Sequence, residues 1–256
     1  MSAERDVTAR SAQPRIQPKL ATVVAHRIVQ EIKARNLGPG AQLPPERDML
    51  LNYNVGRNTL REALRVLEQQ GVLMIRPGPG GGPVVTSPDS RHLASTLALL
   101  MQFAETPFRT VIETRQLLEP ITARLTCEHA DPAVLAQLRE SVDKMARNLD
   151  DLDEFLDENR RFHSIIGWGS ENALFGYCIN SLHWITDGTV LGVDYPKRFR
   201  KLVWQAHDEV CNGIESGDPT QAEVAMRKHM DDTRTYFEKN YRHLMDEVLT
   251  WEMYGQ

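Results

Sequence analysis

The sequence predicts a mainly α-helical protein with two parts: three short helices followed by a β-hairpin, and then an all-α bundle of six or seven helices. Residues 17–86 support the first part, because helical apolar spacing there gives way to a glycine-rich segment between two short β-prone runs. Residues 91–256 support the second, because helical segments separated by turn residues follow one another without a convincing strand. With 41% hydrophobic and 25% charged residues, the composition is that of an ordinary globular protein, which argues against fibrous and disordered classes.

The N-terminal segment, residues 1–16, is polar and has no helical stripe, so we predict a mobile arm. Its arginines either contact DNA or belong to a solvated tail. A first helix is predicted from Pro18, because apolar residues recur there at steps of four and form one face. These residues are Leu20, Val24, Ile28 and Ile32. The turn at residues 37–40 ends this helix.

Two further short helices are predicted on either side of a tight turn. Pro44 and Pro45 followed by acidic Glu46 suit a helix start, because proline has no N–H to lose in a first turn. We expect this helix to end near residue 53 and the next to span residues 57–70. A glycine, Gly71, follows the second helix, as is common at helix ends.

The second of these helices has two different faces. Its apolar face consists of Leu60, Ala63, Leu64 and Leu67. Its polar and basic N-terminal tip consists of Arg57, Asn58, Thr59 and Arg61. A helix with an apolar back and a basic tip is what a recognition helix needs to enter a DNA major groove. We therefore expect these four tip residues to contact DNA.

A hairpin follows at once, with residues 72–75 and 83–86 as its strands and a tip made almost entirely of glycine and proline. With Arg76 and Gly78 in it, the tip is a candidate wing that holds phosphates or groove edges together with Arg47. The alternative is a nucleotide-binding loop. A P-loop would need a Lys-Ser/Thr pair after the glycines and a helix opening from them, and neither is present in the sequence.

The stretch PPERDMLLNYNVGRNTLREALRVLEQQGV resembles the winged helix-turn-helix of the GntR regulators, whose usual pattern has PxER, then VSRxxxREAL, then a glycine. The sequence departs from this pattern at Gly56, where the family usually has a serine or threonine helix cap. Glycine is a tolerable cap, and it weakens the helix start by about a few tenths of a kcal/mol. The resemblance implies a DNA-binding domain over residues 17–86.

Charge is distributed unevenly along the chain. The formal net charge is −5, yet residues 17–86 have nine Lys/Arg against five Asp/Glu, a net charge of +4. Residues 87–256 have 18 Lys/Arg against 28 Asp/Glu, a net charge of −10. This asymmetry favours one DNA-facing module joined to an acidic second domain.

The three cysteines are widely spaced and include no CxxC pair, which disfavours a disulfide scaffold and a zinc finger. The N-terminus lacks the apolar core of a signal peptide, and no run approaches the ~18 apolar residues of a membrane span. We therefore expect a cytoplasmic protein with no membrane partner.

After a linker at residues 87–90, the second domain is predicted over residues 91–256. Its turn residues divide it into seven helical segments. These segments are residues 91–103, 108–130, 133–149, 152–167, 172–186, 196–216 and 220–247.

Four polar side chains in this bundle suit a divalent metal. Asn159 and His163 share one helix face, because they are four residues apart. His207 and His229 lie on either side of the turn at residues 217–219, so both reach the same level of the bundle. Three imidazoles and an oxygen suit zinc, nickel or similar ions. From spacing alone, a metal site and a set of partly buried polar residues remain equally open. The latter role is assigned to His26, His92, His129, His183 and His243.

The second domain is similar to the FCD effector domain of the FadR-type branch of GntR regulators. In that domain an Asp-x-x-x-His pair and histidines on two later helices bind metal, and His163, His207 and His229 match the pattern. The resemblance, which covers roughly residues 18–245, therefore implies a metal site. Asn159 stands where aspartate is common and brings no charge to the ion, which lowers the expected affinity.

Arg115 and Glu119 lie one turn apart. They form either a surface or interface ion pair worth under ~1 kcal/mol, or a site in which Arg115 binds an acid with its guanidinium fork. The family resemblance favours the second role, because its members often bind organic acids through an arginine at this motif. Trp184 and Trp204 either line the same cavity or belong to the core.

Together these features predict a homodimeric, ligand-responsive repressor that binds a near-palindromic double-stranded operator and is released by a small carboxylic acid. Two other classes remain open. A metal-dependent hydrolase would use the same histidines to activate water, but Glu158 faces away from Asn159 and His163, and no other carboxylate is an obvious general base. A structural nucleoid protein would bind DNA without sequence preference and would not respond to a ligand.

Overall fold

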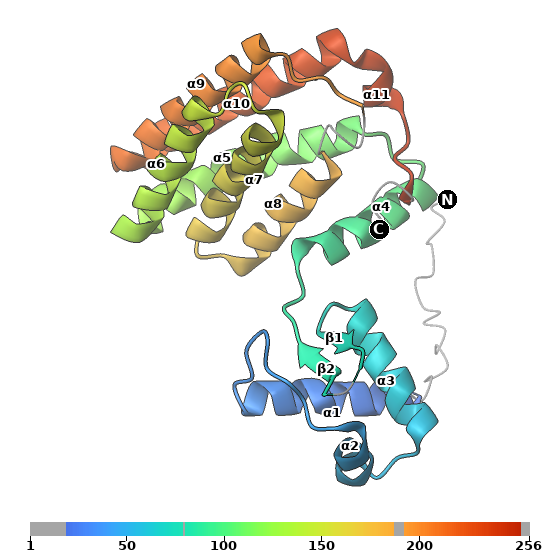
Figure 1. Cartoon of the computed structure of the whole chain (residues 1–256). Helices are drawn as coiled ribbons and strands as arrows, with labels where there is room; N and C mark the ends of the chain where they lie inside the picture. The colour runs from blue at the N-terminus through green and yellow to red at the C-terminus, as the bar shows by residue number, and fades with distance from the viewer. Residues whose placement is uncertain (1–18, 79, 187–191, 252–256) are drawn as a thin grey trace, which may run out of the picture. The chain divides into compact units, whose positions relative to one another are not determined.

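The computed structural model describes residues 19–78, 80–186 and 192–251 (Figure 1). The protein is mainly α-helical, as predicted, and divides between Pro88 and Asp89 into two compact units. The predicted arm, residues 1–16, lies outside the described residues. In the described part of the chain, no helix is long and apolar enough to cross a membrane.

The N-terminal unit contains three helices, which are α1 (Leu20–Ala34), α2 (Glu46–Tyr53) and α3 (Arg57–Gln69). Their apolar faces form one core, in which Ile28, Met49 and Leu60 are almost completely buried. Leu20 was predicted to lie on the apolar face of the first helix with Val24, Ile28 and Ile32, but its side chain is 60% exposed. It is the first residue of α1, and the helix buries Ala21, Val24, Ala25 and Ile28.

Two local signals fix the turns around α2 and α3. Asn54 ends α2 in the left-handed conformation, with φ 52°, and Gly71 follows α3 with φ 69°. Both residue types adopt this backbone conformation more easily than others. The strands β1 (Leu73–Arg76) and β2 (Gly82–Val85) then form an antiparallel hairpin, with Arg76 opposite Gly82.

The C-terminal unit is an all-α bundle. Its helices are α4 (Ser90–Phe103), α5 (Arg109–His129), α6 (Pro132–Arg147), α7 (Leu152–Gly169), α8 (Ala173–Ile185), α9 (Lys197–Glu215), α10 (Pro219–Asn240) and the short α11 (Arg242–Asp246). The loops before α6, α7, α8 and α10 each place an Asp or Asn at the helix N-cap, where its side chain accepts a backbone N–H. These caps are Asp131, Asp151, Asn172 and Asp218.

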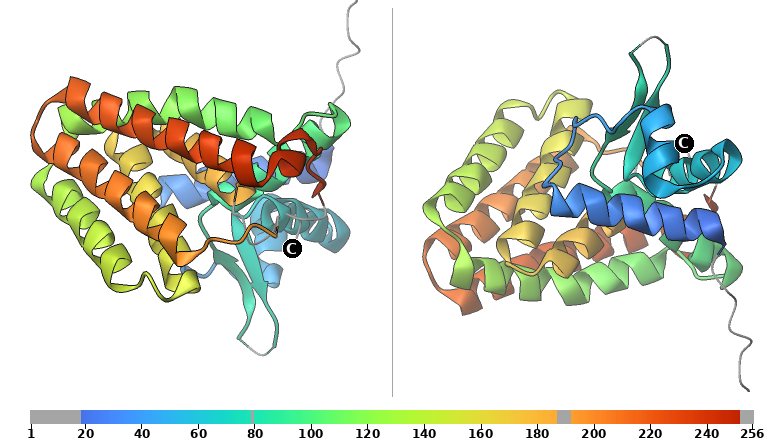
Figure 2. Two further views of the ribbon diagram at one scale, coloured as in Figure 1. Left: turned by 90° about the horizontal axis from the view of Figure 1, so that it is seen from above. Right: turned by 90° about the horizontal axis from the view of Figure 1, so that it is seen from below.

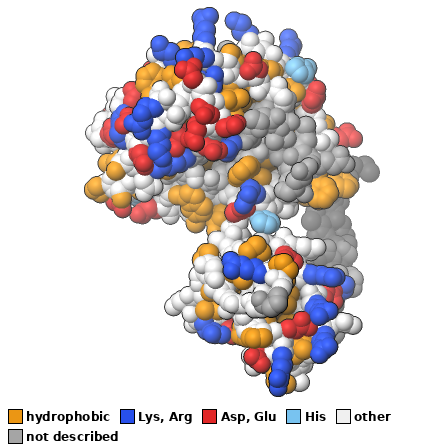
Figure 3. All heavy atoms as spheres, in the orientation of Figure 1, with side chains coloured by type: hydrophobic (Ala, Val, Ile, Leu, Met, Phe, Trp, Pro, Cys, Tyr) orange, Lys and Arg blue, Asp and Glu red, His pale blue; other side chains and the backbone are white. Residues whose placement is uncertain are grey.

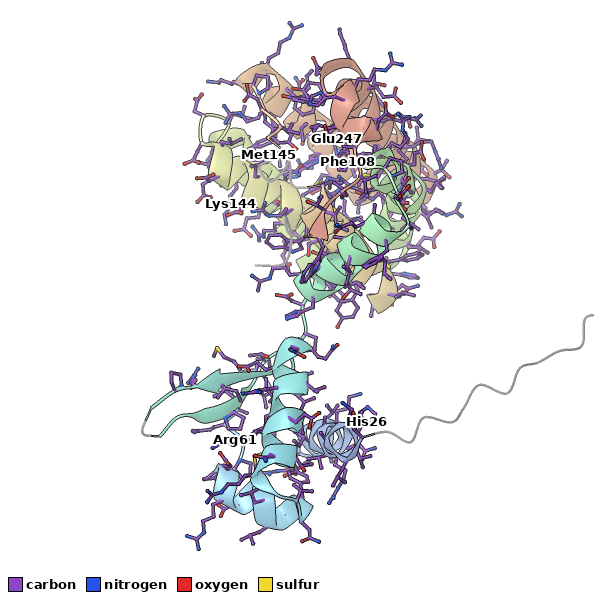
Figure 4. The ribbon with its side chains drawn as sticks, turned by 90° about the vertical axis from the view of Figure 1, so that its right-hand side faces the viewer. His26, Arg61, Phe108, Lys144, Met145 and Glu247 are labelled. Carbon is purple, nitrogen blue, oxygen red and sulfur yellow. The ribbon has the colours of Figure 1, made fainter. Side chains whose placement is uncertain are left out.

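The predicted last segment, residues 220–247, is not one helix. It ends at Asn240, and α11 follows after Tyr241, whose φ and ψ of −136° and 40° are not helical. The bundle is closed beside this break, where the backbone N–H of Phe108 donates to the carbonyl of Glu247 at 2.9 Å (Figure 4).

The long helix α10 packs along both α5 and α9, and α7 packs between α6 and α8 (Figure 2). The pair α9 and α10 approaches closely near its connecting turn. A Cβ built on Gly213 would lie 3.1 Å from the Cα of Ala222, so only glycine fits here without a shift of the backbone. Antiparallel packing of this pair brings His207 and His229 to the same level, as the spacing predicted.

Candidate metal centre and nucleic-acid interface

The N-terminal tip of α3 is accessible to a large ligand. Arg57, Asn58 and Arg61 are exposed and Thr59 is half-buried, whereas the opposite face of α3 is buried in the core. Gly56 occupies the N-cap without a side-chain hydrogen bond, so the first N–H groups of α3 remain open to an acceptor. The geometry suits entry of this tip into a groove of DNA.

Within the described residues, Arg61 pairs with one acidic side chain, that of Glu46. Its guanidinium lies 3.3 Å from Glu46 at the start of α2, and its side chain is 64% exposed (Figure 4). An exposed pair of this kind is worth less than ~1 kcal/mol, so a phosphate or base can replace Glu46 at little cost. Arg47, the residue after Glu46, is also exposed.

The hairpin tip is held in a defined shape. The side-chain amide of Gln42 donates to the carbonyl oxygens of Gly80 and Gly81, at 3.0 and 3.2 Å. A Cβ on Gly81 would lie 2.3 Å from the carbonyl oxygen of Arg76, which excludes any other residue without a change in the tip. Arg76 and Gly78 are exposed, as a wing requires.

Basic side chains are prominent on the visible face of the N-terminal unit, whereas acidic and basic side chains alternate over the bundle (Figure 3). This distribution agrees with the opposite net charges of the two parts of the sequence, +4 for residues 17–86 and −10 for residues 87–256. The electrostatic footprint of a DNA-binding surface therefore lies on the N-terminal unit.

Inside the bundle, three of the four predicted metal ligands meet. His163 of α7, His207 of α9 and His229 of α10 are all buried, and their ligand nitrogens lie within 4.8 Å of one another. The Nε2 atoms of His207 and His229 are 3.1 Å apart. Two nitrogens at this separation are suitably placed to bind one ion.

Burial keeps these histidines neutral. It lowers the pKa of His163 and of His229 to about 3, and it holds the pKa of His207 well below its ordinary value. The neighbouring Glu119 only partly opposes this effect at His163. Neutral imidazoles keep their lone pairs free at neutral pH, so the donor set fits a divalent ion such as zinc or nickel.

The fourth predicted ligand, Asn159, is half-buried and lines the same cavity as His163 and His229. This cavity has a volume of about 50 Å³, and Arg115, Arg160 and Thr186 also line it. A wider open groove of about 730 Å³ lies against α9 and α10, and His229 lines both spaces. The cavity lining in the described part of the chain includes neither Trp184 nor Trp204.

Arg115 also lines the cavity, but protein groups occupy its guanidinium. Its Nε donates to Glu119 at 2.6 Å, one terminal nitrogen donates to Thr186 at 2.9 Å, and the other lies 2.7 Å from Nε2 of His183. All four residues of this network are buried. Arg115 is therefore a fixed charge at the edge of the cavity.

The sequence argument missed two members of this network. His183 was assigned an ordinary polar role, yet it is buried against Arg115 and Glu119, and burial lowers its pKa to about 4. Glu119 was considered only as a partner of Arg115, yet its other oxygen contacts Nδ1 of His163. The i, i+4 spacing of Arg115 and Glu119 gave no signal of these contacts across the bundle.

Glu119 is therefore a carboxylate beside the metal ligands, which the sequence argument against a hydrolase did not foresee. Burial opposes its ionisation, but Arg115 and the hydrogen bond from His163 hold its pKa well below the ordinary value. A carboxylate with such a pKa is a weak general base. Glu158, as predicted, faces elsewhere and accepts a hydrogen bond from Ser141 of α6 at 2.8 Å.

Comparison with protein families gives two matches in chain order. The model "Bacterial regulatory proteins, gntR family" matches residues 20–81, and the model "FCD domain" matches residues 110–232. The first covers the helices and hairpin of the N-terminal unit. The second covers the helices that contain every candidate metal ligand.

Curated relatives agree with these matches. The "HTH-type transcriptional repressor NanR" of Edwardsiella tarda (strain FL6-60) is 27% identical over 224 residues, which cover 86% of this chain and 85% of the relative. The protein with the same name from Escherichia coli (strain K12 / DH10B) is 24% identical over 250 residues, 96% and 89% of the two chains. Among solved structures, Streptococcus agalactiae GntR matches with a TM-score of 0.68 and 26% identity, and covers 84% of this chain and 99% of that one.

Proposed function

This chain belongs to the GntR family of bacterial regulatory proteins, with an FCD domain after its DNA-binding domain, and from this premise we propose that it is a repressor released from its operator by a small organic acid. The observation that supports the proposal best is that one chain combines an exposed basic tip on α3 with a buried three-histidine cage. The first feature suits DNA, and the second suits a regulatory ligand.

In this proposal the N-terminal unit binds a near-palindromic double-stranded operator. The tip of α3 enters the major groove and reads bases, with Arg57 and Asn58 foremost because they are the most N-terminal exposed residues of the helix. Arg47 and the wing, with Arg76 and Gly78, hold phosphates or the edges of a groove.

Two copies bind one operator, because a two-fold dimer presents two identical reading heads. The bundle offers surface for association, since large apolar side chains are exposed on its first two helices. These are Leu100 and Phe103 of α4 and Leu117 and Ile121 of α5. Leu117 and Ile121 are four residues apart on α5 and form one exposed stripe.

We propose that His163, His207, His229 and Asn159 hold a divalent metal ion. When bound, such an ion attracts the carboxylate of an effector as a Lewis acid. The three imidazoles fix the position of the ion, and the adjoining cavity orients the acid. Since the cavity is small and His229 also lines the groove at α9 and α10, a larger acid would place its carboxylate inside and the rest of the molecule in the groove.

Arg115 contributes fixed positive charge beside this site. Its ion pair with Glu119 is buried, and displacement of Glu119 by a ligand would leave an unpaired buried carboxylate. We therefore assign Arg115 to the effector site as a charge that the ligand approaches without breaking the pair. The protein is not an enzyme in this proposal, because Glu119, the only carboxylate among the described residues that contacts the cage, is held by ion pairing.

A regulator of this kind acts where the chromosome is, in the cytoplasm.

The proposal is tested with the full chain, an operator selected from random duplexes, and zinc or nickel with a panel of small carboxylic acids. We expect a metal and one acid to raise Tm together, and the same acid to release the operator. Sequence-independent binding of DNA that no acid changes would contradict the proposal.

A further inference from the structure

The replacement of the common aspartate by Asn159 leaves the histidine cage without a charged ligand, and the structure shows where a negative charge lies instead. Glu119 of α5 is 1% exposed and contacts Nδ1 of His163 through Oε2. We infer that Glu119, acting through His163, supplies the negative charge that Asn159 does not. This inference rests on the metal site of the proposed function.

The contact determines which nitrogen of His163 can bind metal. An ionised carboxylate only accepts hydrogen bonds, so Nδ1 carries the proton and Nε2 keeps its lone pair. His163 is stacked with His229 and lies edge-on to His207, with ring centroids 5.4 and 4.9 Å apart. A carboxylate on the far nitrogen of a ligating imidazole raises its basicity and fixes its orientation.

Glu119 is itself held in one position. Arg115 and His183 contact its other oxygen, Oε1, at 2.6 and 3.4 Å. The guanidinium keeps the buried carboxylate ionised, while Oε2 remains directed at His163. Glu119 is thus a positioning residue for the cage, because it contacts the candidate ligand His163.

His207 has no comparable support. Its Nδ1 is buried and has no hydrogen-bond partner among the described residues. Its ring is instead held by stacking on Phe162, with centroids 4.0 Å apart and planes 12° from parallel. His163, in contrast, has a carboxylate on its Nδ1.

The test uses full-length Glu119→Gln, with Glu158→Gln as the matched control, since Glu158 is also a buried carboxylate but faces α6. Zinc affinity is measured by competition with a coloured chelator, and folding by thermal unfolding in EDTA. Outer partners of ligating histidines typically contribute about 10–100-fold to metal affinity. We expect a loss of this size in Glu119→Gln and a change of less than about threefold in the control.

Rescue separates charge from damage to the fold. In the double variant Glu119→Gln/Asn159→Asp, a carboxylate returns at the ligand position, and we expect zinc affinity to recover to within about tenfold of wild type. Unchanged zinc affinity in Glu119→Gln, or no recovery in the double variant, would overturn the role of Glu119 but not the metal site. Failure of the wild type to bind zinc would overturn the metal site and this inference together.

A second, independent observation concerns the route from the cavity to the start of the bundle. The indole of Trp184 on α8 lies close to two arginines from other helices. The guanidinium carbon of Arg160, on α7, lies 5.2 Å from the ring centroid, and that of Arg91, on α4, lies 5.7 Å from it. Arg160 lines the cavity next to Asn159. Arg91 is the second residue of α4, immediately after the boundary between the two units.

The start of α4 is attached to α8 at a second point, where the Ser181 hydroxyl donates to the carbonyl of Ser90 at 3.1 Å. Asp89 caps the helix by accepting from the backbone N–H of Arg91, and it also pairs with the Arg91 guanidinium. We propose that Trp184 couples occupancy of the cavity to the order of residues 89–94. Asn159 and Arg160 both line the cavity, so a ligand bound there would lie beside the arginine that faces Trp184.

Hydrogen–deuterium exchange of the full chain, with and without zinc, tests this coupling. In the wild type we expect zinc to slow exchange in α7 and α10 and also in residues 89–94. In Trp184→Leu the first effect should remain and the second should disappear. Trp168→Leu is the control, because Trp168 on α7 lies edge-on to Tyr177 and, in the described part of the chain, makes no cation–π contact with either arginine.

Protection of α7 and α10 without protection of residues 89–94 in the wild type would overturn the coupling. So would protection of residues 89–94 that is unchanged in Trp184→Leu. Absence of zinc protection everywhere would overturn the metal site and the coupling together.

Discussion

The Nε2 atom of His207 lies 3.1 Å from the Nε2 atom of His229, and both side chains are buried. Only one of these nitrogens can carry a proton in such a contact, so the pair excludes a doubly charged state. Nearby His163 adds a third imidazole, and burial disfavours protonation of all three.

This arrangement makes the stability of the metal-free protein depend on pH. An unfolded histidine binds a proton near pH 6.5, whereas the pKa is about 3 for folded His163 and His229 and about 4 for His183. Between these values the unfolded state holds more protons than the folded state. The free energy of unfolding therefore falls as pH falls below about 6.5, and above that pH none of it is lost through these histidines. At pH 5.5, each buried histidine should lower the free energy of unfolding by about 1 kcal/mol relative to its value above pH 6.5.

Urea unfolding in EDTA at pH 7.5 and pH 5.5 measures this effect. We expect a smaller loss in His183→Gln than in the wild type, because one buried histidine is removed, while exposed His26→Gln should match the wild type. Equal stability of the wild type at the two pH values would contradict the burial of neutral histidines.

Arg57→Ala should weaken specific operator binding by about 1–3 kcal/mol, because an arginine that reads a base contributes about this much discrimination. Base preference should relax at one position of the selected operator. The matched control is Arg35→Ala, which removes an exposed positive charge at the end of α1. Fluorescence anisotropy with operator variants measures both, and an unchanged base preference in Arg57→Ala would contradict the assignment of this residue to a groove.

Gly81→Ala should impair the wing without unfolding the protein. The added Cβ would lie 2.3 Å from the carbonyl oxygen of Arg76 and 2.9 Å from those of Pro77 and Gly78, so the backbone of the tip must move. We expect operator affinity to fall by about 1–2 kcal/mol, near tenfold, with Tm almost unchanged because the tip lies outside the core.

Gly38→Ala is the control for this variant, because a Cβ at Gly38 meets no atom within 4 Å. Gel-shift titration gives operator affinity, and differential scanning fluorimetry gives Tm. Wild-type affinity in Gly81→Ala would show that the shape of the hairpin tip does not matter for DNA binding.

The N-terminal unit was predictable from sequence because short-range chemistry determines its turns. Pro45 precedes α2, Asn54 ends it, and Gly71 follows α3, each where its backbone preference requires. The long helices of the bundle were predicted for the same reason. The break at Tyr241 was missed, since neither glycine nor proline marks it and packing of Tyr241 against Phe237 and Tyr236 determines it.

The sequence predicted that three histidines of the bundle lie together, but it did not predict what surrounds them. His163, His207 and His229 match a spaced pattern, whereas the contacts of Glu119 with His163 and of Arg115 with His183 join residues 44 and 68 positions apart. The spacing of residues along the sequence does not predict which face of α5 packs against which face of α8. For the same reason His183 could not be distinguished from the other isolated histidines.

Gly213 and Ala222 lie near the turn that joins α9 to α10, and their backbones touch because Gly213 has only hydrogen as a side chain. His207 precedes Gly213 by six residues and His229 follows Ala222 by seven. The distance between the helix axes at the Gly213–Ala222 contact therefore affects the distance between the two imidazoles. A residue larger than glycine at position 213 would push α9 away from α10 and so lengthen the 3.1 Å distance between the Nε2 atoms of His207 and His229.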